Sequence, residues 1–217
     1  MTPEAERTPA ARDRRRSDGE LVRLHDHAQA LRAAYLRRPS YNCSPAAITA
    51  ADTAATNGLR RFVADVGWPW AELHGDEVAD AALVIALRSD RDPVLQLRCR
   101  DLLRHAVSSK MDAAYRWAFL VDRCAAGHAE PQTFGTRVRW RDGKLLVHPI
   151  AAPGRLDGRR HSVGLGPHAD YVREVAQFAA AAREDPLLLP GRPRSGSADP
   201  FPVTGLGKDS SPSSAHR

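Results

Sequence analysis

Residues Tyr115–Arg137 read YRWAFLVDRCAAGHAEPQTFGTR, and they join a helical pattern to a strand pattern. Four residues recur at three- and four-residue spacing and mark one face of a helix: Tyr115, Ala118, Phe119 and Asp122. Arg123 lies about 100° round that helix from Asp122, so the carboxylate and the guanidinium are expected to point in different directions. A polar site is therefore expected where this helix, the loop around Gly135 and the following strand meet.

A β-hairpin is predicted over residues 136–148. The segments Thr136–Trp140 and Lys144–His148 flank Asp142-Gly143, and Asp-Gly is typical of a two-residue type I′ turn. The resulting register buries Trp140. It makes one face apolar, with Val138, Trp140, Leu145 and Val147, and the other face mainly basic, with Arg137, Arg139, Leu146 and His148.

The rest of the chain is predicted to be mainly helical. Helices are expected over residues 20–38 and 45–66, after the caps Asp76, Asp92 and Asp112, and from Pro167 to Ala182. In the helix after Asp92, Gln96 and Arg100 lie off the predicted buried face. We therefore expect a mainly α fold: one domain of about six helices over residues 20–183, with the hairpin between the fifth and sixth helices. Disordered tails are expected at 1–19 and 184–217.

Composition limits the class of protein. No run approaches the roughly 20 apolar residues that cross a bilayer, and the first residues lack the apolar core of a secretory signal, so a cytoplasmic protein without a membrane partner is expected. Cys43, Cys99 and Cys124 form no CxxC pair, which indicates reduced thiols. Within helices, Cys99 and Cys124 are expected in the core. Of the formal net charge of +6, +5 lies between Arg137 and Arg173, where eight Lys or Arg residues face three Asp residues.

The sequence resembles a bacterial family, common in actinobacteria, known as domain of unknown function 6624. The resemblance covers Asn57–Tyr171 and implies a fold without a reaction. Two polar positions depart from the family pattern, because Arg88 stands where His is usual and Arg137 where Gln is usual. The matching features are Asn57, Gly67-Trp68-Pro69, Asp90, Asp92-Pro93, Gln96, Asp122-Arg123, Gln132, Gly135-Thr136, Pro149-Ile150, Asp157, Arg159-Arg160, Gly164-Leu165 and Tyr171.

Five polar residues are candidates for a common pocket: Asp90, Asp122, Arg123, Gln132 and Arg160. In our leading hypothesis, Arg123, Arg160 and Gln132 bind a small anionic ligand near the hairpin. A rival hypothesis is a hydrolase-like enzyme in which Asp90 and Asp122 act as acid and base. The structural alternative is an ion pair between Asp122 and Arg160, with Gln132 satisfying backbone groups of the loop and Asp90 helping to cap a turn.

A protein partner and nucleic acid are two further possibilities. A protein-interaction module would use the hairpin edge or exposed helix faces to bind a protein partner. A basic patch of Arg137, Arg139 and Arg159 would suit nucleic acid, but a solvated basic face explains the same charges and ranks higher. No cofactor motif is present, and the histidines are too dispersed to predict a metal site.

Overall fold

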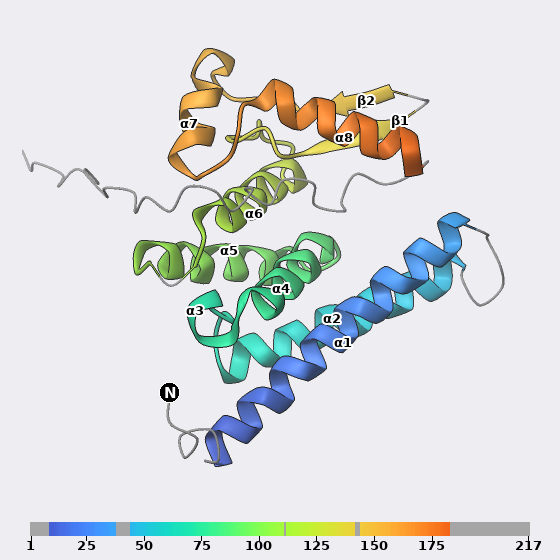
Figure 1. Cartoon of the computed structure of the whole chain (residues 1–217), viewed down its shortest axis with the longest axis vertical. Helices are drawn as coiled ribbons and strands as arrows, with labels where there is room; N and C mark the ends of the chain where they lie inside the picture. Colours follow the sequence, from blue (N-terminus) through green and yellow to red (C-terminus); the bar gives the residue numbers. More distant parts are fainter. Residues whose placement is uncertain (1–8, 38–43, 111, 142–143, 183–217) are drawn as a thin grey trace, which may run out of the picture.

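The computed structural model describes residues 9–37, 44–110, 112–141 and 144–182. Within these residues the chain is mainly helical with one two-stranded hairpin, as predicted (Figure 1). The elements are α1 (Pro9–Arg37), α2 (Pro45–Asp65), α3 (Ala71–His74), α4 (Asp76–Arg88), α5 (Pro93–Ser108), α6 (Ala114–Gly127), β1 (Val138–Arg141), β2 (Lys144–Val147), the 3-10 helix η2 (Pro153–Arg155), α7 (Leu156–Ser162) and α8 (His168–Ala182).

Helix α4 lies at the centre of the helical layer and contacts α1, α2, α3, α5 and α6. Its segment Ala81–Leu87 is apolar on every side, and all seven residues are buried. A helix that is apolar all round must be covered on all faces, which explains its central position. Figure 1 shows α1 and α2 as a pair on one side of α4, and α6 between α5 and the hairpin with α7 and α8.

Two predicted helix starts are confirmed by their caps. The Ser44 hydroxyl accepts a hydrogen bond from the Ala47 amide at 3.2 Å, and Pro45 opens α2. Asp92 accepts one from the Leu95 amide at 3.0 Å, and Pro93 opens α5. In both cases the side chain satisfies an amide that has no partner within its helix, and proline has no amide to satisfy.

The other helix boundaries differ from the predictions. Helix α1 begins at Pro9 rather than Glu20, and its early part packs on the domain because Asp18 pairs with the buried His74 at 2.7 Å. Gly75, not Asp76, is the N-cap of α4, and Ala113, not Asp112, is the N-cap of α6.

The short helices α3 and α7 were not predicted, because four and seven residues are too few to show a helical period.

The predicted position of Gln96 on its helix is wrong. Its side chain is buried rather than off the core face, and it donates to the Ala86 carbonyl at 2.9 Å.

The hairpin has the predicted register. Val138 pairs with Val147, Arg139 with Leu146, and Trp140 with Leu145. Val138 is buried against the core. The Asp142-Gly143 turn, the Trp140 side chain, Cys43 and the segments 1–8 and 183–217 lie outside what the structure describes. Among the described helices, none is both long and apolar enough to cross a membrane.

Candidate functional site

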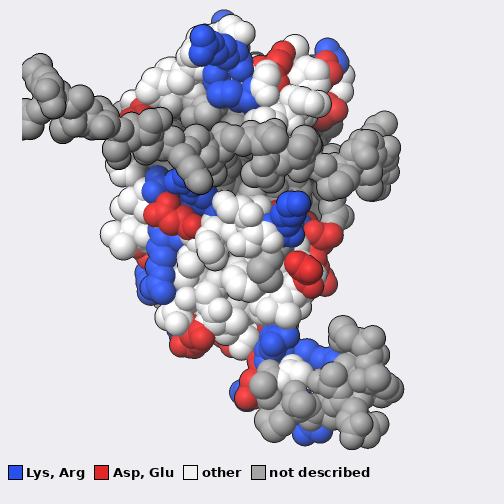
Figure 2. Space-filling view, turned by 90° about the vertical axis from the view of Figure 1, so that its left-hand side faces the viewer, with Lys and Arg blue, Asp and Glu red and all other residues white. Residues whose placement is uncertain are grey.

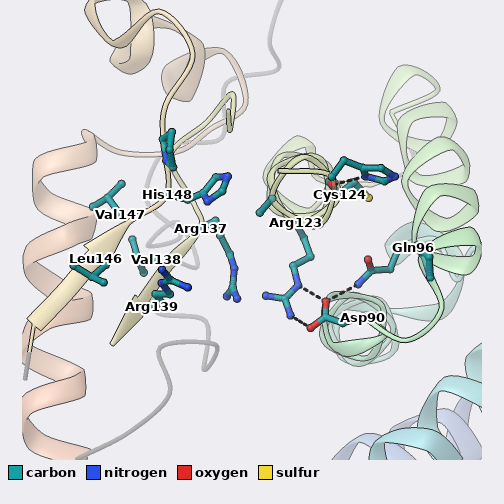
Figure 3. A pocket seen from close by; sticks show the side chains of 15 residues that line it. Asp90, Gln96, Arg123, Cys124, Arg137, Val138, Arg139, Leu146, Val147 and His148 are labelled. Atoms are coloured by element: carbon teal, nitrogen blue, oxygen red, sulfur yellow. Dashed lines mark hydrogen bonds and ion pairs between the residues drawn. The ribbon is translucent and has the colours of Figure 1, made fainter. Parts of the chain in front are cut away.

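A groove of about 740 Å³ separates the helical layer from the hairpin. The start of α5 and the end of α6 form one wall, and the base of the hairpin forms the other (Figure 3). We call this cavity the hairpin groove. Its polar and charged lining residues are Asp90, Gln96, Arg123, His128, Arg137, Arg139 and His148, and its apolar ones include Pro93, Val138, Leu146 and Val147.

Asp90 and Arg123 meet on the helical wall of the hairpin groove. The Arg123 guanidinium donates from Nε to Asp90 Oδ1 at 2.8 Å and from Nη2 to Asp90 Oδ2. Gln96 Nε2 approaches the same Oδ1 at 3.3 Å. Asp90 is held from two sides, although its own side chain is 59% exposed. The structure therefore brings together two of the five predicted site residues.

One nitrogen of Arg123 has no partner. Arg123 is only 6% exposed, and its Nη1 is buried without a hydrogen-bond acceptor among the described residues. In Figure 3, this third nitrogen points away from Asp90, toward the hairpin side that carries Arg137. Buried donors are normally satisfied, so an unpaired one beside a cavity marks a position where an acceptor would be stabilised.

The hairpin brings further positive charge to this groove. Arg137 directly precedes β1 and Arg139 lies within it. Both line the groove, as alternate residues of an extended chain that point to the same side. Arg139 is exposed, and its side chain has no hydrogen-bond or ion-pair partner in the described part of the chain. With Arg123, the described part of the lining holds three guanidinium groups and one carboxylate, that of Asp90. The groove is therefore electropositive.

Asp122 does not line the groove, and it organises the loop that follows α6. It is fully buried and accepts hydrogen bonds from the amides of Thr133, Phe134 and Thr136 at 2.7–3.1 Å, and from the Thr136 hydroxyl at 2.9 Å. Burial raises the pKa of Asp122, and these donors act in the opposite direction. Both oxygens of this carboxylate accept hydrogen bonds from the loop, so Asp122 fixes the loop conformation.

Gln132 ties the same loop to the base of the hairpin. Its Nε2 donates to the carbonyls of His148 at 2.7 Å and Arg137 at 3.1 Å, and its Oε1 accepts from the Arg137 amide at 2.7 Å. Its backbone also bonds to Pro149 and Ala151. Gln132 thus satisfies backbone groups, as the structural alternative proposed, and it positions the strand that carries Arg137.

Arg160 and Arg159 also bind backbone carbonyls. Arg160 is buried and donates to Gly166 O at 2.6 Å and Phe134 O at 2.7 Å, and its guanidinium lies 5.1 Å from the centre of the Tyr171 ring. Burial lowers the pKa of Arg160. Arg159 donates to Thr133 O at 2.8 Å. Neither side chain lines the hairpin groove, and no ion pair joins Arg160 to Asp122 within the described residues.

The described thiols behave as buried apolar groups. Burial raises the pKa of Cys99 to about 12 and also raises that of Cys124, which lines the groove. Neither forms a disulfide. A thiol with a raised pKa is a poor nucleophile at neutral pH. In the described part of the chain, no group of three His, Cys, Asp or Glu side chains is placed to hold a metal ion.

An ion network around the buried Arg116 was missed by sequence reasoning. Arg116 is 1% exposed and donates to Asp80 at 2.8 Å, Asp112 at 2.6 Å and Asp76 at 2.7 Å. These bonds raise the pKa of Arg116 against the effect of burial. The network joins the start of α6 to α4. The spacing of Asp112 and Arg116, four residues apart, was its only local signal.

Surface charge is mixed on one face of the described part of the molecule. On the face drawn in Figure 2, basic and acidic side chains are interspersed around uncharged areas, and no continuous basic field covers the described part of that face. This arrangement differs from the clustered footprint of nucleic-acid-binding surfaces.

The helices, loop and hairpin define a mainly helical fold, and this fold does not by itself specify a reaction. Its sequence matches a family of unknown function, DUF6624, over residues 16–181, and the chain belongs to that family. No curated protein and no solved structure matches the chain.

Proposed function

We propose that the hairpin groove binds a small anionic ligand. The observation that carries this proposal is the buried and unpaired Nη1 of Arg123 beside the groove. Leaving a buried donor unsatisfied costs about 1–3 kcal/mol, and an anionic acceptor would remove this cost. The groove volume of about 740 Å³ also lies within the range of ligand sites.

The ligand contacts in this proposal differ from those expected from the sequence. Arg123 remains the central residue, whereas the side-chain donors of Arg160 and Gln132 bond to backbone carbonyls. Arg139 takes their place as a ligand contact, because it lines the groove and is exposed. Arg137, which also lines the groove, adds to the positive potential.

The groove gives less support to a hydrolase. An acid and a base must both reach the substrate, and Asp122 does not line the groove and accepts four loop donors. Asp90 does line it, but its carboxylate is held by Arg123. Binding therefore ranks above hydrolysis.

Thermal unfolding with sulfate, phosphate or citrate tests the proposal. A ligand at roughly 100 times its Kd stabilises by about 2.7 kcal/mol, so the wild-type Tm should rise by several degrees. Arg139→Ala should reduce this shift. Arg155→Ala removes an exposed arginine outside the groove and should keep it. The proposal fails if no anion stabilises the protein, or if both variants respond like wild type.

A further inference from the structure

We infer that the anion bound in the hairpin groove is the phosphate of an organic phosphate monoester, whose organic part lies against the apolar residues of the hairpin. This inference rests on the proposed function, because it names the chemical class of that ligand. Three features of the groove carry the inference: the unpaired Nη1 of Arg123, the charge of the lining residues, and the apolar surface of the groove.

The geometry of Arg123 leaves one edge of its guanidinium to a ligand. Arginine binds a carboxylate best through two parallel hydrogen bonds from one edge of the guanidinium. The edge formed by Nε and Nη2 is already occupied by Asp90. The other edge remains, formed by Nη1, which has no partner, and by the second N–H of Nη2. A planar carboxylate would use both of its oxygens at this edge. A tetrahedral phosphate has a further oxygen, which can accept from a guanidinium of the opposite wall at the same time.

The charge of the lining matches a dianion. Among the described lining residues, three arginines, Arg123, Arg137 and Arg139, stand beside one carboxylate, Asp90, and their formal charges sum to +2. A phosphate monoester carries about −1.5 to −2 at pH 7. A single carboxylate would balance only half of the formal excess.

The size and surface of the groove call for more than an inorganic ion. Its volume of about 740 Å³ far exceeds that of a phosphate group. Leu146 is 37% exposed and Val147 is 38% exposed, and both line the groove together with Pro93. Apolar surface beside a charged site gains free energy when an organic group covers it. The phosphate is therefore expected near Arg123 and the organic part near Leu146.

Calorimetric titration of the full chain tests this inference. The probes are adenosine 5′-monophosphate, glucose 6-phosphate, inorganic phosphate, adenosine and citrate. At least one of the two esters should bind roughly tenfold more tightly than inorganic phosphate and citrate, and adenosine should not bind. The comparison of the nucleotide with the sugar phosphate shows which organic part the apolar wall accepts.

Two exposed variants separate the parts of the site. Arg139→Ala should weaken binding of the preferred ester roughly tenfold. Leu146→Ser should weaken the ester and leave inorganic phosphate unchanged, and a loss of folding would be visible as a changed circular dichroism spectrum. If citrate binds as tightly as both esters and loses affinity in Arg139→Ala, the anion site stands and the phosphate assignment is overturned. If no probe binds, both proposals are overturned.

Discussion

Arg123 of α6 forms two hydrogen bonds to Asp90, which lies between α4 and α5. Arg123 Nε is 2.8 Å from Asp90 Oδ1, and Nη2 bonds to Oδ2. The two residues differ in environment, because the side chain of Arg123 is 7% exposed and that of Asp90 is 59% exposed. The pair therefore fixes a buried guanidinium from its solvent side. The orientation that results leaves Nη1 for a ligand, and this makes Asp90 a competitor of that ligand as well as a support.

Asp90→Asn is expected to separate these two roles. The free energy of unfolding should fall by only about 1 kcal/mol, because the lost carboxylate is more than half exposed. Affinity for phosphate should rise, because the groove loses the negative charge of Asp90. Urea unfolding and phosphate titration measure the two effects. Asp170→Asn, which breaks the exposed pair with Arg173, is the matched control and should leave affinity unchanged. Weaker phosphate binding in Asp90→Asn would contradict this account.

Asp122→Asn is expected to destabilise the fold. An amide cannot accept at both positions, so several loop donors lose a charged acceptor in a fully buried site. The expected loss is about 2–4 kcal/mol, measured by urea unfolding. Asp101→Asn, at a surface position, should be nearly neutral. A variant of wild-type stability would show that the carboxylate is not required for the loop, and would return Asp122 to the candidates for chemistry.

Gly135→Ala is expected to cost more than Gly67→Ala. Both glycines have positive φ, +69° and +93°, so both substitutions strain the backbone. At Gly135 an added Cβ would also lie 2.6 Å from Cδ2 of His168, whereas at Gly67 nothing lies within 4 Å. The difference in unfolding free energy should be about 1–3 kcal/mol. In a double variant, His168→Ala should reduce the additional loss of unfolding free energy caused by Gly135→Ala. Equal losses of unfolding free energy in Gly135→Ala and Gly67→Ala would contradict the predicted contact.

The stability of the protein should depend on pH through His168. Burial and the nearby Arg160 lower the pKa of His168, while Asp157 and Asp122 act in the opposite direction. The unfolded state, with a His pKa of about 6.5, then binds more protons than the folded state. The free energy of unfolding contributed by His168 is therefore present at neutral pH and is lost as the pH falls through about 6.5.

His168→Gln tests this dependence. The variant should lose less stability than wild type between about pH 7.5 and pH 5.5, measured by urea unfolding at each pH. His105→Gln changes an exposed histidine and serves as the control. Parallel pH profiles for wild type and His168→Gln would contradict the lowered pKa.

Local sequence patterns predicted the parts of the fold that depend on local physics. The caps at Ser44 and Asp92 act on amides three residues away, and the hairpin register follows from alternation around a short turn. The partners of a polar side chain depend instead on how distant segments pack. Arg160 was paired with Asp122 as an alternative, but its donors reach the Phe134 and Gly166 carbonyls, and no local pattern distinguishes these outcomes.

The same limit applied to the site. The sequence pointed to the region between α6 and the hairpin, and Asp90, Arg123, Arg137 and Arg139 do line one groove there. Sorting these residues from Asp122 and Gln132 required knowing which polar atoms the loop itself uses. Buried backbone amides need hydrogen-bond acceptors, and Asp122 is the acceptor for the amides of Thr133, Phe134 and Thr136. Its carboxylate is therefore used within the loop.

The most direct test of the anion site is a nuclear magnetic resonance titration of arginine Nε–Hε signals in the full chain with inorganic pyrophosphate. Substitutions Arg123→Lys and Arg139→Lys assign the two signals. The account predicts saturable shifts of the Arg123 and Arg139 signals, while those of Arg155 and Arg160 stay in place. Unchanged Arg123 and Arg139 signals, or equal small shifts of all arginines, would contradict a ligand site in the hairpin groove.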